Sequence, residues 1–439
     1  MDGDHRRLGG ALQALFTEGA DALNQEIGFI QRERGFTVGS LVALLVFGWI
    51  ERPRQSFAAL SMRAGVSAQA LQQRLTDKAV VFFQALLQEA LRITLMGRPP
   101  LIPLVRRFTA IQVHDSTQLP LPASLAADYP ACGGLDGQRG KAGWKLLIRF
   151  DLLTGGLLPF TILPGKTSDR QALPEPLIDL RAGMLYLADL GFFCLARLRQ
   201  VVQRQAHYIT RLPAHVNVTG ADGVTRLVGE WLHHKNGSIL DEMVWLGHER
   251  ELRTRLVACR LPEPVAAERR RKLRAKNRKR QRNVSANQLA LCDWWVGVTD
   301  LSVTELSADE VRILYGLRWQ VELLFKHWKQ SNGLGDVRGR TAASVQVEYL
   351  AKLLGAIVTH CQALLSGGPL EGKNRQAIHR LVCDACAQLA SALQTQATLE
   401  EIVLIMQDLS GKLKHLRRRP RRKRTASTRQ RLYGKRVAA

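Results

Sequence analysis

Residues 307–333 read SADEVRILYGLRWQVELLFKHWKQSNG, and this stretch decides how the rest of the chain is interpreted. Ser307 followed three residues later by Glu310 forms a capping box, so a helix is expected to begin there. Asn332-Gly333 is a helix stop signal. Between these ends, apolar side chains recur at helical spacing and form one stripe that should face the core. The stripe consists of Leu314, Leu317, Val321, Leu324, Phe325 and Trp328.

Four polar residues follow a line beside this apolar stripe. At about 100° per residue, Tyr315, Arg318, Glu322 and Lys329 fall within a band of roughly 60° that runs about 21 Å along the helix axis. A carboxylate flanked by cations at the edge of a cleft suits a metal ligand set against a sugar-phosphate backbone. The alternative is a surface helix with ion pairs one turn apart, since Arg318 and Glu322 are separated by four positions. The helix alone does not decide between them.

Upstream of this helix, the sequence has the texture of a mixed α/β sheet. FTAIQVHDST (residues 108–117) is expected to be a strand ending at Asp115, and AGMLYLADLGFF (182–193) a strand ending at Asp189. Residues 144–165 predict a hairpin that turns at 154–156, and a helical segment follows at about 169–180. Taken singly, each aspartate could equally be a turn or cap residue.

Three polar residues near these strand ends are left out of the predicted site. His114 precedes Asp115 and either tunes the site or lies on the other face of the sheet, which the alternation of strand side chains favours. Asp151 and Asp169 are explained by their positions at turns.

Carboxylates at two strand ends and on one helix suit phosphodiester chemistry. The reaction needs a nucleophile made from water or a 3′-hydroxyl and relief of charge on the leaving oxygen. Two divalent ions about 4 Å apart provide both, and clustered carboxylates are their usual ligands.

The residues also resemble a known family. Tyr315, Arg318, Glu322 and Lys329 match the Tyr-x2-Arg-x3-Glu-x6-Lys signature of the DDE transposases of bacterial insertion sequences (the insertion sequence four family). VHDST resembles the first-aspartate motif of that family and LADLGFF its second, and the motifs stand in the same order. The resemblance covers about residues 105–365.

The resemblance implies a ribonuclease H-like sheet interrupted by a β-rich insertion, in which Asp115, Asp189 and Glu322 are catalytic and bind two Mg²⁺ ions, with Mn²⁺ able to substitute. It implies cut-and-paste transposition: cleavage at the terminal inverted repeats of double-stranded DNA, then joining of the 3′ ends to target DNA, carried out by a homodimer. Use of a hairpin intermediate stays open. The alternatives are a nuclease of the same fold without strand transfer, and a non-catalytic or decayed DNA-binding regulator.

Further residues are assigned to DNA by the resemblance. Tyr315, Arg318 and Lys329 would contact phosphates at the transposon end. A tryptophan in the strand before the helix would stack on a flipped base, and Trp295 matches better than the neighbouring Trp294. The alternative for Trp295 is a place in the core.

The chain is expected to comprise five segments. These are a helical DNA-binding region (1–105), the first part of a ribonuclease H-like domain (106–206), a β-rich insertion with a basic run at 269–282 (207–291), the second part of that domain (292–368), and a helical region with a basic tail at 412–436 (369–439).

The first segment contains a stretch, residues 57–75, that reads either as a helix-turn-helix or as an ordinary helical hairpin. Ser67 would cap the second helix, with Leu71 and Leu75 facing inward. The side chains expected to face outward are Gln69, Gln72, Gln73 and Arg74.

Charge and composition agree with a nucleic-acid partner. The formal net charge is +25 and the pI is near 10.4, which indicates a polyanion such as DNA, although a merely soluble basic protein is the alternative. The apolar stretch at 38–50 is shorter than the roughly 20 residues that a membrane span needs, so a buried helix is expected. No export leader is recognised, and seven scattered cysteines argue against a disulfide framework. We therefore expect a bacterial cytoplasmic protein associated with the nucleoid.

Overall fold

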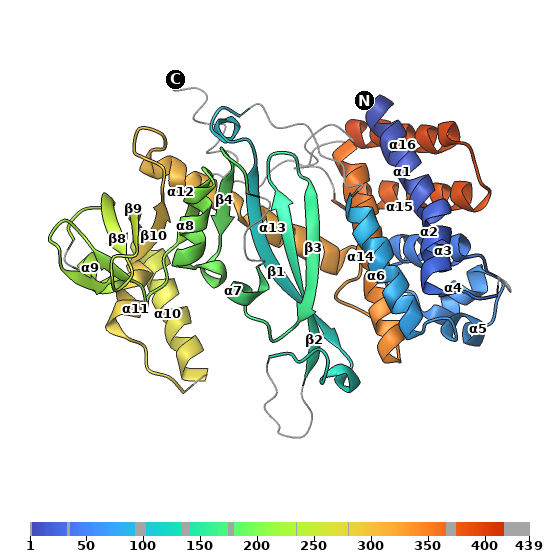
Figure 1. Cartoon of the computed structure of the whole chain (residues 1–439), viewed down its shortest axis with the longest axis horizontal. Helices are drawn as coiled ribbons and strands as arrows, with labels where there is room; N and C mark the ends of the chain where they lie inside the picture. Colours follow the sequence, from blue (N-terminus) through green and yellow to red (C-terminus); the bar gives the residue numbers. More distant parts are fainter. Residues whose placement is uncertain are drawn as a thin grey trace.

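The computed structural model describes residues 2–32, 36–92, 102–132, 141–173, 180–233, 235–279, 281–365 and 375–416. Within these residues, ten strands form a single sheet in the order β3-β2-β1-β4-β5-β10-β9-β8-β6-β7. In Figure 1 the strands β1 to β4 lie between a helical region at one end of the molecule and the β-rich part of the same sheet at the other. The predicted α/β class with flanking helices is therefore confirmed.

The first half of the sheet is the ribonuclease H-like part. Its strands are β1 (Ile111–Leu121), β2 (Ala142–Asp151), β3 (Leu157–Pro164), β4 (Leu185–Ala188) and β5 (His207–Arg211). The first three form an antiparallel meander, in which a longer connection separates β1 from β2 and a short turn joins β2 to β3. β4 then lies parallel to β1, and β5 parallel to β4. The short helix α8 (Leu195–Gln203) makes the crossover between β4 and β5.

The β-rich segment extends this sheet. It contains β6 (Asn217–Thr219), β7 (Thr225–Leu227), β8 (Ile239–Leu246) and β9 (Leu252–Arg260), with the helices α9 (Val228–His233), α10 (Glu263–Lys279) and α11 (Ala286–Ala290). β10 (Trp294–Thr299) pairs with β9 on one side and β5 on the other. β5 lies within the range that the sequence analysis assigned to the insertion, yet it pairs with β4. The local sequence of a strand does not reveal which strand it pairs with.

The two ends of the chain form one helical region. Its helices are α1 (Asp2–Phe16), α2 (Glu18–Ile27), α3 (Val38–Glu51), α4 (Phe57–Arg63), α5 (Ala68–Gln72), α6 (Asp77–Arg92), α14 (Ala342–Leu365), α15 (Arg375–Gln394) and α16 (Leu399–His415). α3 is the buried helix expected from its apolar sequence, and it packs against α14 and α15. α1 packs on α16, where His5 Nε2 lies 2.9 Å from Ser410 Oγ. Most of the predicted basic tail, from residue 417 onward, lies outside the described residues.

Helix α14 joins this helical region to the sheet. In the described part of the chain it is long and apolar enough to cross a membrane, but 89% of its apolar window is buried inside the protein. The Tyr349 hydroxyl donates to Pro120 O at 2.9 Å, and His360 Nε2 lies 2.7 Å from Gly155 O. α14 is therefore a core helix that fixes the helical region against β1 and the β2–β3 turn.

The predicted helix at 307–333 is present but broken. Ser307 caps α12 (Ala308–Leu317) through the expected capping box with Glu310, and α13 (Trp319–Gln330) continues the path. The break falls at Arg318, whose backbone N–H bonds Tyr315 O three residues back rather than four. The apolar stripe is continuous through the break, so periodicity alone could not reveal it.

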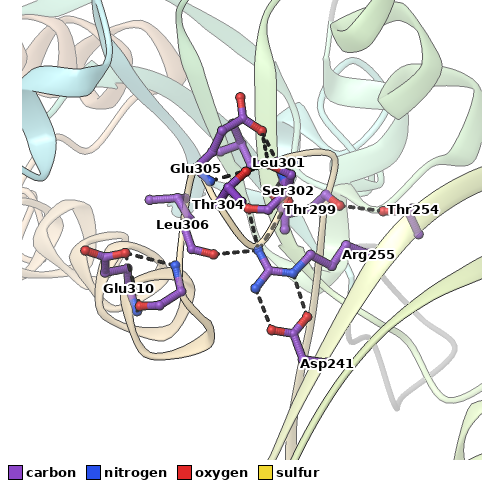
Figure 2. A network of polar contacts seen from close by, with 11 residues as sticks. Asp241, Thr254, Arg255, Thr299, Leu301, Ser302, Thr304, Glu305, Leu306 and Glu310 are labelled. Atoms are coloured by element: carbon purple, nitrogen blue, oxygen red, sulfur yellow. Dashed lines mark hydrogen bonds and ion pairs between the residues drawn. The ribbon is translucent and has the colours of Figure 1, made fainter.

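A buried arginine in the β-rich region fixes the loop that leads into α12 (Figure 2). Arg255 on β9 is 3% exposed and makes a bidentate ion pair with Asp241 on β8, with both N–O distances 2.6 Å. Its Nη1 also donates to the carbonyls of Leu301, Ser302 and Leu306, at 3.2, 2.9 and 2.6 Å. The insertion thereby sets where the helix begins.

Candidate active site

A cleft of about 480 Å³ opens where the middle of β1 and the carboxyl end of β4 face α13. The residues that line it are Asp115, Ser116, Asp189, Arg318, Glu322, Phe325, Lys326, Lys329 and Gln330. Five of the seven residues proposed from the sequence are among them. The other two, Tyr315 and Trp295, lie behind the cleft wall.

The two aspartates are neighbours because of strand register. β1 pairs in parallel with β4, with Val113 opposite Leu187, so two residues further on Asp115 and Asp189 come level. β4 is fully buried up to Ala188, and its chain leaves the core at Asp189. Asp189 thus follows the end of β4, whereas the prediction that the first strand ends at Asp115 is wrong. β1 continues to Leu121, because β2 pairs with it along nearly its whole length, and Asp115 projects from inside the strand.

Glu322 completes the group from the first turn of α13, and Arg318 joins all three carboxylates. Arg318 Nη2 lies 2.5 Å from Glu322 Oε1, Nη1 lies 3.6 Å from Asp115 Oδ2, and Nε lies 3.9 Å from Asp189 Oδ1. The Arg318 side chain is only 13% exposed. Its position at the helix break directs the guanidinium between the acids.

The aromatic residues support this group from behind. The buried Tyr315 hydroxyl donates to Asp189 Oδ1 at 3.2 Å. Trp295 is 8% exposed and packs edge-on against Tyr315, with ring centroids 5.9 Å apart. Trp294, the other candidate, is 3% exposed and lies beneath the Arg260 guanidinium. In this DNA-free structure both indoles are core side chains.

Crowding of acids changes their protonation. Burial, with smaller contributions from the charges of Asp189 and Glu322, raises the pKa of Asp115 to about 6 against the opposing effects of the Ser116 N–H and Arg318. Additional positive charge in the cleft would lower this pKa again. A cation bound in the cleft would therefore favour the charged form of Asp115.

The donor chemistry of the cleft suits a divalent metal ion, because carboxylate oxygens are the ligands that Mg²⁺ prefers. Within the described ranges, however, no three His, Cys, Asp or Glu side chains come close enough together to hold one ion. Arg318 contacts all three acids of the site. In this structure the guanidinium therefore lies where a cation shared by the three carboxylates would bind.

Several residues of the site were missed from the sequence. Ser116 and Lys326 line the cleft, and Lys326 could have been found because it follows Glu322 by one helical turn. Asp169, set aside as a turn residue, accepts hydrogen bonds at 2.7 Å from the Ser116 hydroxyl and from Lys145 Nζ. It thus links α7 (Asp169–Ala172) to β1 and β2. No local sequence pattern predicts these contacts of Asp169.

The remaining polar residues lie where the sequence analysis favours. His114 is 2% exposed, points away from the cleft and packs on Tyr186, with ring centroids 5.0 Å apart. Burial, with the charges of Arg149 and Arg197, lowers its pKa to about 3, so the ring is neutral. Asp151 accepts hydrogen bonds from backbone N–H groups and the Thr154 hydroxyl at the β2–β3 turn.

Comparison with known proteins agrees with this geometry. The family model described as a transposase DDE domain matches residues 106–357, more than half of the chain. The chain is 27% identical over 375 residues to the transposase for insertion sequence element IS231F of Bacillus thuringiensis subsp. israelensis, covering 78% of this chain and 77% of that protein. It is 22% identical over 249 residues to the transposase for IS1151 of Clostridium perfringens, covering 53% and 52%.

A third relative is the putative transposase InsL for insertion sequence element IS186A of Escherichia coli (strain K12), 27% identical over 231 residues that cover 50% of this chain and 60% of that protein. The matched region contains Asp115, Asp189, the helix with Glu322 and the strands between them. The chain therefore belongs to the transposase DDE domain family and is a DNA transposase.

Proposed function

We propose that this transposase cuts DNA at the terminal inverted repeats of its own element and joins the freed 3′ ends to target DNA, using Asp115, Asp189 and Glu322. The observation that carries the proposal is the single cleft in which these three carboxylates meet Arg318 and two lysines. Acids to bind metal ions and cations to bind phosphates are the two requirements of phosphodiester chemistry.

The carboxylates would hold two Mg²⁺ ions, with Mn²⁺ able to substitute. When bound, such ions activate the attacking hydroxyl and stabilise the leaving oxygen. Asp115 and Asp189 are fixed by their strands, so they define the position of the metals. Glu322 becomes available when Arg318 releases it, and Arg318 is then free to bind a phosphate.

Residues along α12 and α13 would bind the DNA backbone. Lys329 is half-buried at the cleft, and burial lowers its pKa, so a phosphate beside it would raise that pKa again. Tyr315 and Arg318 would contact phosphates of the transposon end. Trp295 would stack on a flipped base, which requires the Tyr315 contact to open.

The assembled enzyme would be a homodimer that pairs two transposon ends in the bacterial cytoplasm. The helical region that packs α1 to α6 against α14 to α16 carries the proposed DNA-reading hairpin, α4 and α5. Ser67 caps α5, and the exposed side chains of this helix and its end include Gln69, Gln72 and Gln73. These glutamines suit base edges or phosphates.

The test uses purified protein and a labelled duplex carrying the DNA that flanks this gene. Mg²⁺-dependent cuts at the ends of the element should appear with the wild type and be lost with Glu322→Gln. The matched control is Glu249→Gln, which changes an exposed glutamate in the turn after β8 and should cut at the wild-type rate.

The products separate the alternatives. Recombinant joints with a target plasmid identify a transposase that completes strand transfer, whereas cuts without joints identify a nuclease. Binding without cuts in either protein identifies a DNA-binding regulator. Cleavage by Glu322→Gln at the wild-type rate would show that the assignment of the third carboxylate is wrong.

A further inference from the structure

A second cleft, of about 570 Å³, lies between the α4–α5 hairpin and the start of α14. The α4 and α5 side contributes Ser56, Phe57, Ala58, Ala68 and Gln72. The opposite side contributes Arg338, Arg340, Thr341 and Ser344. Two arginines and several hydrogen-bonding side chains line this groove, and none of its lining residues is acidic. The chemistry suits an anion with several oxygens.

The groove is joined to the active site by a short loop. Residues 331–341 connect the end of α13 to α14, and Gly335 N donates to Lys329 O at 3.3 Å. Gly333 has a φ of +70° and lies against Pro53, so a side chain there would strain the turn. The same loop therefore begins beside a cleft lysine and ends at the two groove arginines.

A buried ion pair fixes this loop. Lys352 Nζ lies 2.7 Å from Glu348 Oε1 on α14, and both side chains are fully buried. Lys352 also donates to Gly333 O at 3.1 Å and Asp336 O at 2.7 Å. Glu348 Oε2 accepts from the backbone N–H groups of Arg338 and Gly339, at 2.8 and 2.9 Å.

Burying such a pair brings little net stability, because desolvation offsets most of the attraction. Here the polar atoms of both side chains bond to the loop backbone, so the pair specifies the conformation of the loop. Arg338 and Arg340 are thereby presented on a preformed surface. The backbone that carries them is already ordered, so ligand binding does not have to order it.

The two arginines are available to a ligand. Arg338 is 48% exposed, and its Nε is 3.9 Å from Asp336 Oδ1, a contact that solvent weakens. Arg340 is exposed and has no ion-pair partner among the described residues. Guanidinium groups form bidentate hydrogen bonds with phosphates, so two neighbouring arginines suit a phosphate, which offers several oxygens.

We propose that this groove binds the phosphate backbone of duplex DNA through Arg338 and Arg340. The loop connection further assigns it to the duplex that enters the active site, which rests on the proposed function. The α4–α5 hairpin and the catalytic helix would then hold one DNA molecule at two points. The pinned loop sets the spacing between them.

The experiment measures binding of a fluorescein-labelled 30-base-pair duplex of random sequence by anisotropy, in EDTA and over a range of salt concentrations. Random sequence is suitable because phosphate contacts do not depend on bases. The variant is Arg338→Gln/Arg340→Gln. The control is Arg6→Gln/Arg181→Gln, which removes the same charge from exposed positions on α1 and before β4.

The groove variant should bind roughly tenfold more weakly. The slope of its log Kd plotted against log salt concentration should fall by about two, one for each lost phosphate contact. The control should keep the wild-type salt dependence. Equal behaviour of both variants, or wild-type binding by the groove variant, would overturn the proposal. Because both substitutions are at exposed positions, an unchanged thermal melt confirms that the variants fold.

Binding in EDTA is independent of cutting. The groove proposal can therefore be refuted while the catalytic proposal stands, and the catalytic proposal can be refuted while the groove proposal stands. With the flanking-DNA substrate in Mg²⁺, the groove variant should need about tenfold more DNA for half-maximal cleavage. Its rate at saturating DNA should equal that of the wild type. A lower rate at saturation with unchanged half-maximal DNA would refute the assignment to the duplex in the active site.

Discussion

The Arg318 guanidinium donates to the Glu322 carboxylate at 2.5 Å, across the break between α12 and α13. Since the same group also neighbours Asp115 and Asp189, an internal cation occupies the charge centre of the cleft. Metal binding must compete with it.

Replacing Arg318 with glutamine should therefore raise the affinity of the DNA-free protein for Mn²⁺, by about tenfold for each 1.4 kcal/mol of relieved competition. Binding of Mn²⁺ can be followed by the loss of the free-ion signal in electron paramagnetic resonance. DNA cleavage should fall by about 100-fold, since a phosphate-binding donor is lost. Arg181→Gln is the control. Weaker Mn²⁺ binding by Arg318→Gln would contradict the competition.

The anchor formed by Arg255 and Asp241 should be important for stability. Arg255→Met leaves Asp241 without its partner and three loop carbonyls without their donor, so the free energy of unfolding in urea should fall by about 3 kcal/mol. Arg253→Met, an exposed change on the same strand, should alter it by less than about 0.5 kcal/mol. Similar losses for both would argue against a specific anchor.

Close packing beside the second aspartate gives a further prediction. A Cβ on Gly191 would lie 2.6 Å from Asp169 Oδ2, so Gly191→Ala must displace Asp169 from Ser116 and Lys145. Cleavage should drop by about tenfold, because a shift near the carboxylates disturbs their geometry.

Adding Asp169→Ala removes the closest clashing atom. If crowding against Asp169 is the cause, the double variant should cut at the same rate as Asp169→Ala, because the second change then has nothing left to displace. Single-turnover cleavage at saturating DNA measures all three. A double variant slower than both single variants would show that the two residues act independently.

The pair His207–Asp300 predicts a pH effect on stability. The hydrogen bond to Asp300, 2.7 Å long, raises the pKa of His207 above its ordinary value, against the opposing effect of burial. A raised pKa in the folded state means that the stabilisation is complete below about pH 6.5 and is lost as pH rises through the folded pKa. The gap in melting temperature between wild type and His207→Asn should therefore be larger at pH 6 than at pH 9.

His248→Asn, at an exposed position after β8, supplies the control for that experiment. Its melting temperature should follow the wild type at both pH values. A gap for His207→Asn that stays constant or widens toward pH 9 would disagree with the sign of the shift.

Sequence patterns predicted the sheet and the capped helix, because these follow from local periodicity and capping residues. They placed Asp115 at the end of a strand that in fact continues to Leu121, because the pairing of β1 with β2 is not visible in the local sequence. The convergence of Asp115 and Asp189 required the parallel register of β1 and β4, which no local pattern contains. The inward turn of Arg318 depended on a helix break that leaves the apolar stripe intact.

Contacts distant in sequence were the least predictable. Asp169 was explained as a turn residue, and only the fold reveals its bonds to Ser116 and Lys145. Trp295 was assigned to DNA by resemblance, whereas its packing on Tyr315 depends on the distance between β10 and α12. Tertiary packing, which local propensity does not encode, decides both.

The pairing of α1 with α16 has a consequence for synthesis of the protein. Residues 5 and 410 touch, and the buried faces of α3 are covered by helices from the carboxyl-terminal region. The helical region cannot close until the ribosome has delivered α16. A nascent chain stopped after the sheet would lack α15 and α16, so incomplete products should be protease-sensitive instead of accumulating as competing DNA binders.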